Sequence, residues 1–229
     1  MHLFKDILDL VYPKTCSSCG IALLDKENVI CMQCVHELPK SEWHTQTDNP
    51  LTKLFWGRIP VFSAAAYYVF RQGGHVQRLL HQLKYRNMPE IGIKIGMLYG
   101  EDLADAPLFS TADYIVPVPL HKDKLKKRGY NQSACFGEGL VQVMRANLDT
   151  NLLIRTENTE TQTRKSRYAR WENVSDVFQV TDASRLYGKH ILLVDDVITT
   201  GSTIEACAQT LLNSGVSKLS IASIAMPTH

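Results

Sequence analysis

A short segment near the C-terminus, residues 191–203, constrains the fold of this chain more than any other. Four apolar residues typical of a buried strand lead directly into Asp195 and Asp196, and a turn rich in hydroxyl groups follows before a helical pattern begins. Apolar runs of this kind form strands of parallel sheets that helices cover on both faces. Ligands bind beyond the carboxyl ends of such strands, so we expect the two carboxylates and the turn to line a binding crevice.

The turn after the two acids contains groups that bind phosphate. Its residues are Thr199, Thr200, Gly201, Ser202 and Thr203. They supply backbone N–H groups and hydroxyls at a helix N-terminus, where the helix dipole favours an anion, and the glycine lets the backbone approach closely. The alternative is a capping box between Ser202 and Glu205 that only starts the helix. Ligand binding is favoured, because capping alone gains nothing from two adjacent carboxylates.

Strand and helix patterns alternate along most of the chain. Apolar runs rich in β-forming residues predict strands at residues 61–70, 114–118, 152–154, 191–194 and 219–225. Apolar residues three and four apart predict helices between them. One of these helices carries Gly92, Gly96 and Gly100, which either permit a close backbone contact or merely weaken the helix. The pattern predicts an α/β fold, a mainly parallel sheet with helices on both faces.

Four cysteines near the N-terminus have the spacing of a metal site. They are Cys16, Cys19, Cys31 and Cys34, in the pattern C-x2-C-x11-C-x2-C. Two such knuckles place four thiolates around one ion and leave no open position for catalysis. We therefore expect a small zinc-ribbon-like module held by one structural Zn²⁺. Cys135 and Cys207 lie on predicted helices without partners at ligand spacing, and we expect them to be buried thiols.

A polar stretch at residues 40–53 separates the cysteine module from the α/β part. We predict two domains, residues 1–45 with an amphipathic N-terminal helix and the module, and residues 58–229. The N-terminus lacks the basic segment of a secretory signal, and the longest apolar run is too short to cross a bilayer as a helix. We expect a cytoplasmic protein without membrane insertion, whose six cysteines form no disulfides.

Positive charge is concentrated locally, although the formal net charge is only +2. One basic stretch holds Lys122, Lys124, Lys126, Lys127 and Arg128, with Tyr130 close behind. Such a stripe beside an aromatic ring can hold single-stranded DNA through phosphate contacts and base stacking. The alternatives are that these bases serve a smaller anionic ligand or form a solvated helix face.

The segment VDDVITTGST resembles the phosphoribosyl pyrophosphate (PRPP) signature of type I phosphoribosyltransferases, and the whole chain is similar to the ComF family. The wider similarity consists of the cysteine module, LLHQLKYR at residues 79–86, VPVPLHKDKLKKRGYNQS at residues 116–133, and Gln162, Arg170, Asn173 and Phe178 in that order. ComF proteins are linked to DNA uptake in natural transformation. The resemblance implies a type I phosphoribosyltransferase-like sheet, PRPP as ligand, and DNA-uptake or recombination proteins as partners.

The resemblance also implies a role for each part of the site. Asp195 and Asp196 would hold the ribose 2- and 3-hydroxyls, and residues 199–203 would wrap the 5-phosphate. The pyrophosphate loop would begin at Val118 and Pro119. The cations that would neutralise the leaving pyrophosphate, together with Mg²⁺, are Lys84, Arg128, Arg164 and Arg167. Segments at residues 51–69 and 178–185 would form the hood that reads the acceptor.

Three functions fit these features. The first is transfer of phosphoribose from PRPP to a nitrogen acceptor, and the second is PRPP sensing or nucleic-acid handling without turnover. The third is PRPP-responsive regulation, which is disfavoured because the N-terminal module shows no helix-turn-helix. The sequence also lacks G-x-S-x-G and G-x-x-x-x-G-K-[ST], which disfavours a serine hydrolase and an ATP-driven motor.

Overall fold

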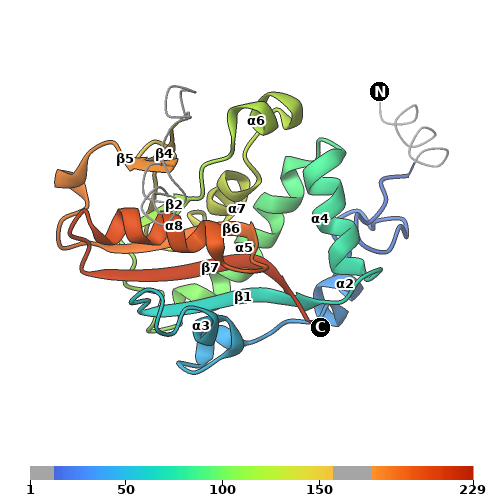
Figure 1. Cartoon of the computed structure of the whole chain (residues 1–229). Helices are drawn as coiled ribbons and strands as arrows, with labels where there is room; N and C mark the ends of the chain where they lie inside the picture. Colours follow the sequence, from blue (N-terminus) through green and yellow to red (C-terminus); the bar gives the residue numbers. More distant parts are fainter. Residues whose placement is uncertain (1–12, 157–176, 229) are drawn as a thin grey trace.

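The central feature of the fold is a five-stranded parallel sheet. The computed structural model describes residues 13–156 and 177–228. The strands lie in the order β1, β7, β6, β2, β3 (Figure 1). Their bounds are Ser63–Phe70 for β1, Lys218–Pro227 for β7, His190–Val197 for β6, Tyr114–Pro117 for β2 and Asn147–Leu148 for β3. The predicted parallel sheet is confirmed, and β6, which carries the two acids, is its central strand.

Helices cover both faces of the sheet, as predicted. They are α3 (Pro50–Leu54), α4 (His75–Tyr85), α5 (Pro89–Ala104), α7 (Gln132–Leu140) and α8 (Ser202–Leu212). Leu192 and Val194 of β6 belong to the apolar core that holds α4, α5 and α7, whereas Ile191 and Leu193 belong to the core that holds α3 and α8. Successive strand side chains point to opposite faces, so this strand has to be apolar at every position.

The remaining described elements lie outside these layers. They are α2 (Met32–Glu37), α6 (Lys122–Arg128), the 3-10 helices η1 (Trp43–Thr45) and η5 (Ala183–Arg185), and the strands β4 (Leu153–Arg155) and β5 (Phe178–Val180). The strand predicted at residues 152–154 exists as β4, but it pairs antiparallel with β5 outside the main sheet. Among the described helices, none is both long and apolar enough to cross a membrane.

The helices α5 and α7 are in direct backbone contact. A Cβ atom added at Gly96 would lie 2.2 Å from the carbonyl oxygen of Phe136, and one added at Gly139 would lie 2.1 Å from the carbonyl oxygen of Ile93. Neither position has room for a side chain. The spaced glycines of α5 therefore serve a close helix contact, which was one of the two alternatives that the sequence left open.

The cysteine module packs directly on α4. The carbonyl oxygen of Ser18 accepts a hydrogen bond from Arg78 Nη1 at 3.0 Å, and that of Ser17 accepts one from Gln82 Nε2 at 2.5 Å. The buried apolar side chains of the module belong to the same cluster as those of α4 and α5. The module therefore shares its core with the α/β part of the chain.

The polar stretch after the module lies along the edge strand β1. The backbone N–H of Ser41 donates to the carbonyl oxygen of Tyr67 at 2.9 Å, and that of Val69 donates to the carbonyl oxygen of Pro39 at 3.0 Å. This pairing protects a sheet edge that would otherwise present unpaired backbone groups. The predicted connector thus contains η1 and α3 and covers one edge of the sheet.

Candidate functional site

Two strands end side by side at the candidate site. In the pairing of β2 with β6, Pro117 lies opposite Val194, and the N–H of Val118 then donates to the carbonyl oxygen of Val194 at 2.9 Å. The end of β2 therefore brings Val118 and Pro119 next to the two acids. The acids lie within the last three residues of β6 and not after the strand, because β6 stays paired with β7 up to Val197.

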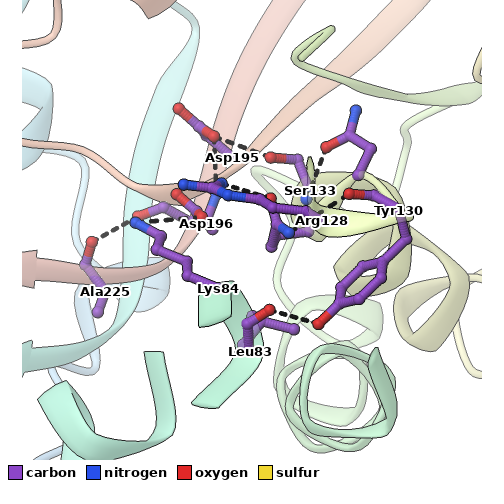
Figure 2. A network of polar contacts seen from close by, with 11 residues as sticks. Leu83, Lys84, Arg128, Tyr130, Ser133, Asp195, Asp196 and Ala225 are labelled. Atoms are coloured by element: carbon purple, nitrogen blue, oxygen red, sulfur yellow. Dashed lines mark hydrogen bonds and ion pairs between the residues drawn. The ribbon is translucent and has the colours of Figure 1, made fainter. Parts of the chain in front are cut away.

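Each of the two carboxylates is held through one oxygen (Figure 2). Asp195 Oδ1 accepts from the Ser133 hydroxyl and from the backbone N–H of Asp196, both at 2.8 Å. Asp196 Oδ2 lies 3.2 Å from Lys84 Nζ in the last turn of α4. Within the described part of the chain, the second oxygen of each carboxylate accepts no hydrogen bond. Two acceptors therefore remain for a ligand that donates hydrogen bonds.

The position of Asp195 makes its carboxyl group hard to ionise. Burial is the larger cause and the charge of Asp196 the second, and together they raise the pKa of Asp195 from 3.8 to about 7. The hydrogen bond from Ser133 and the charge of Lys84 act in the opposite direction. A carboxyl group whose pKa is shifted in this way beside a second acid is typical of a functional site.

The turn after β6 contains a glycine in the left-handed conformation. Gly201 has a φ of 77° and is the N-cap of α8, which begins at Ser202. Ser202 is therefore the first helical residue, and Glu205 pairs with Arg58 instead of closing a capping box. The capping-box alternative is wrong. The exposed residues of the turn are Thr199, Thr200, Ser202 and Thr203.

The segment that contains Phe55 and Arg58, far from the turn in the sequence, packs against it. Arg58 donates to the carbonyl oxygen of Thr200 at 3.3 Å and pairs with Glu205. A Cβ atom at Gly201 would lie 2.9 Å from the Phe55 ring, so glycine is required there by space as well as by its φ. Arg58 and Thr200 are 142 residues apart, and the sequence offers no local signal for their contact. Part of the segment expected to form a hood thus supports the turn at residues 199–203.

Two of the predicted cations lie near the acids. Lys84 contacts Asp196 directly. Arg128 ends α6, donates to Gln132 Oε1 at 2.7 Å, and its guanidinium group lies over the ring of Tyr85, 5.5 Å from the centroid. Since Tyr85 follows Lys84 in α4, the ends of α4 and α6 meet at the site.

The remaining residues predicted for the site differ in exposure, and some of them lie outside the described part of the chain. Tyr130 is half-buried, and its hydroxyl donates to the carbonyl oxygen of Leu83, so its ring is held against α4. The exposed lysines of α6 are Lys122, Lys124, Lys126 and Lys127. The predicted N-terminal helix lies outside the described part of the chain, and so do Gln162, Arg164, Arg167, Arg170 and Asn173.

The four cysteines of the N-terminal module meet at one point. Their Sγ atoms all lie within 4.8 Å of one another, and those of Cys19 and Cys31 are 3.7 Å apart. A tetrahedral zinc ion with Zn–S bonds of about 2.3 Å requires sulfur atoms about 3.8 Å apart. Burial raises the pKa of Cys31 and raises that of Cys34 to about 12, whereas at Cys16 backbone N–H groups including those of Cys19 and Cys31 outweigh burial and lower the pKa to about 6. The close approach of the four sulfur atoms, and not these opposing pKa shifts, matches a tetrahedral site. The cluster can therefore hold a metal ion.

The two other cysteines are buried in helices, as predicted. Cys135 in α7 and Cys207 in α8 are 5% and 0% exposed. Burial raises the pKa of both thiols, that of Cys135 to about 12. Both side chains are therefore neutral core residues.

Replacing Asp195 by Asn should stabilise the protein at pH 8. The pKa of this carboxyl is higher in the folded chain than its value of about 3.9 in an unfolded chain, so stability falls as pH rises from 4 to 7. Asparagine removes the charge and keeps an oxygen that accepts from Ser133. The free energy of unfolding should rise by about 1 to 3 kcal/mol at pH 8, and the difference should vanish near pH 4. Urea unfolding between pH 4 and 8.5 measures it.

Asp182→Asn provides a matched control for this substitution. Asp182 is exposed, and its hydrogen bonds with Ser184 lower its pKa, so its loss should destabilise the protein slightly at pH 8. The charged and titratable neighbours of Asp195, which are Lys84, Asp196 and Cys207, are unchanged in both variants. An Asp195→Asn protein less stable than the parent at pH 8 would contradict the raised pKa.

Comparison with known proteins identifies relatives along nearly the whole chain. Residues 136–228, which include both acids and the turn, match the family described as "Phosphoribosyl transferase domain". The chain is 30% identical over 210 residues to DNA utilization protein YhgH of Escherichia coli K12, covering 90% of this chain and 87% of that protein. It is 28% identical over 147 residues to competence protein F of Haemophilus influenzae, covering 62% and 64%.

A solved structure of the allosteric regulatory enzyme of purine biosynthesis is 18% identical, with a TM-score of 0.45 over 63% of this chain and 30% of that one. The family assignment depends instead on the sequence relatives and on what this chain contains. A parallel α/β sheet, a four-cysteine cluster and an acid pair followed by a glycine turn occur together in it. With a relative 30% identical over 87% of that relative's length, this chain belongs to the ComF family of phosphoribosyltransferase-like proteins.

Proposed function

We propose that this protein binds PRPP at the carboxyl edge of its sheet and transfers the phosphoribosyl group to a nitrogen acceptor. The observation that carries the proposal is the position of Asp195 and Asp196 at the end of β6, two residues before the turn at residues 199–203. The two free carboxylate oxygens suit the adjacent hydroxyls of a ribose, and the exposed N-terminus of α8 suits its 5-phosphate. The match to the phosphoribosyl transferase family supports the same assignment.

The cations beside the acids suit the leaving group of this reaction. Departure of pyrophosphate from C1 of the ribose gives an oxocarbenium-like transition state, so the site has to fix the sugar and disperse negative charge. Lys84 and Arg128 would supply positive charge near the loop that begins at Val118 and Pro119. Mg²⁺ bound with PRPP would neutralise further charge on the pyrophosphate. A protein nucleophile is not required.

PRPP with Mg²⁺ should raise the melting temperature of the parent protein. A ligand that binds only the folded state stabilises it by about 2.7 kcal/mol at 100 times its Kd. The double variant Asp195→Asn with Asp196→Asn should lose most of this shift, because amides replace the anionic acceptors of the ribose hydroxyls with weaker neutral ones. Differential scanning fluorimetry with PRPP and Mg²⁺, and with Mg²⁺ alone, makes the measurement.

The control for the PRPP test is Asp25→Asn, which removes an exposed carboxylate of the cysteine module and should keep the full shift. An unchanged shift in the double variant would place the ribose elsewhere. Release of pyrophosphate in a screen of nucleobases and amines distinguishes a transferase from a PRPP sensor or a PRPP-responsive regulator, neither of which requires turnover.

We also propose that the cysteine cluster holds one structural Zn²⁺ through Cys16, Cys19, Cys31 and Cys34. The support is the close approach of four sulfur atoms that suits tetrahedral coordination. Elemental analysis of protein purified without chelator should give one zinc per chain. Cys31→Ser should lower the zinc content and loosen the module while the α/β part stays folded, and Cys135→Ser, outside the cluster, should leave the zinc content unchanged. Protein without zinc would overturn the assignment.

A second candidate function is binding of single-stranded DNA by α6. The support is its row of exposed lysines and the names of the relatives, DNA utilization protein YhgH and competence protein F. We propose accordingly a cytoplasmic role with DNA-uptake or recombination proteins as partners. The half-buried position of Tyr130 makes phosphate contacts the main contribution, so binding should be weak and insensitive to sequence and should fall steeply with salt.

Reversing Lys126 and Lys127 to Glu should weaken single-strand binding and reduce its salt dependence. Fluorescence anisotropy with a labelled oligonucleotide at 50 to 200 mM salt, in the range where counterion release is large, measures both effects. Reversal of the exposed Lys14 and Lys26 changes the net charge equally and is the control. If the α6 variant binds as tightly as the parent at each salt concentration, α6 is not the DNA site.

A further inference from the structure

Four successive residues, the last two before α7 and the first two of α7, contact four different parts of the site. The Tyr130 hydroxyl donates to the carbonyl oxygen of Leu83, next to Lys84. The Nδ2 of Asn131 donates to the carbonyl oxygen of Val118 at 2.9 Å. The Oε1 of Gln132 accepts from Arg128 at 2.7 Å, and the hydroxyl of Ser133 donates to Asp195 at 2.8 Å. One short segment thus reaches α4, the end of β2, α6 and β6.

We infer that residues 130–133 are a positioning element of the PRPP site, in which Ser133 orients the carboxylate of Asp195 and Asn131 fixes the loop that begins at Val118. This inference rests on the proposed function. It concerns groups that do not touch the ligand but determine where the groups that do touch it lie.

The start of α7 does not by itself account for these contacts. Asn131 Oδ1 accepts from the N–H of Ser133 at 3.0 Å and so caps the helix. The bond from Asn131 Nδ2 to Val118 and the bond from the Ser133 hydroxyl to Asp195 add nothing to that cap. Nor does burial alone demand a partner for Ser133, because the equally buried hydroxyl of Ser17 has none within the described part of the chain. Both bonds are therefore directed at the site.

The bond from Ser133 has two consequences for Asp195. It adds a second donor to Oδ1, beside the N–H of Asp196, so that Oδ2 is left to face a ligand. It also favours the ionised carboxylate, against the effects of burial and of Asp196. The other groups that face this carboxyl are Lys84 from α4 and the buried thiol of Cys207 from α8.

Ser133→Ala should therefore weaken PRPP binding in a pH-dependent way. Isothermal titration calorimetry with PRPP and Mg²⁺ at pH 6 to 8.5 should show a Kd about tenfold higher at pH 7, as for loss of a hydrogen bond to a charged group. The difference in Kd between Ser133→Ala and the parent should shrink towards pH 8.5, where Asp195 is ionised even without the hydrogen bond from Ser133. Ser133→Thr, which restores a hydroxyl, should recover most of the affinity, and the control Ser17→Ala, which removes a buried hydroxyl of the cysteine module, should bind as the parent does.

Asn131→Asp tests the second contact with little disturbance of the helix. Aspartate keeps the capping oxygen but replaces the donor to Val118 with an acceptor. The Kd for PRPP should rise by a similar factor throughout pH 6 to 8.5, because a carboxyl group with an ordinary pKa of about 3.9 stays ionised over this range. In the absence of PRPP, carbon-13 NMR should show the carboxyl of Asp195 titrating at higher pH in Ser133→Ala than in the parent.

The outcomes separate the two proposals. If Ser133→Ala and Asn131→Asp bind PRPP as the parent does at every pH, while the double Asp195 and Asp196 variant does not bind, the positioning role is overturned and the PRPP site stands. If the parent itself does not bind PRPP, the proposed function fails and this inference fails with it. An unchanged titration of Asp195 in folded Ser133→Ala protein also contradicts the role of Ser133.

Discussion

The backbone contact between α5 and α7 determines where the supporting groups of the site lie. Gly96 and Gly139 let the two helices approach until a single Cβ atom would collide with backbone. The helix α7 is thereby held against both α5 and the strand β6. Only in this position does its first turn bring Ser133 within hydrogen-bonding distance of Asp195. The glycines contribute no chemistry, yet the geometry of the acid pair depends on them, because a helix displaced by one side chain would move Ser133 out of reach.

The parts of this molecule that the sequence predicts well are those with a strong local signal. The strand leading to Asp195 and Asp196 has to be apolar throughout because both faces of the sheet are covered, and this pattern is visible in four residues. The cysteine cluster is equally local, since the spacing of the knuckles already implies a common centre. Helices such as α4 and α5 follow from apolar residues at helical spacing.

The parts that the sequence does not predict depend on contacts between distant segments. A three-residue apolar run is compatible with a strand of a parallel sheet and with a strand of a small antiparallel pair, so the sequence could not predict the pairing of β4 with β5. The hydrogen bond by which Arg58 supports the turn joins two residues that are 142 positions apart in the sequence. The sequence indicates a role for Asn131, Gln132 and Ser133 only through the similarity of residues 116–133 to the ComF family. Its hydrogen bonds reach Leu83, Val118 and Asp195, and no sequence pattern encodes them.

The helix α4 lies between the cysteine module and the acid pair. Arg78 near its N-terminus donates to the carbonyl oxygen of Ser18, and Lys84 in its last turn pairs with Asp196. These two residues are about 9 Å apart along the helix axis, at 1.5 Å per residue. A metal ion that fixes the cysteine loop would therefore fix one end of the helix whose other end carries the lysine. Metal occupancy and ligand affinity would then be thermodynamically linked, and by reciprocity the ligand-bound protein would retain its metal more tightly.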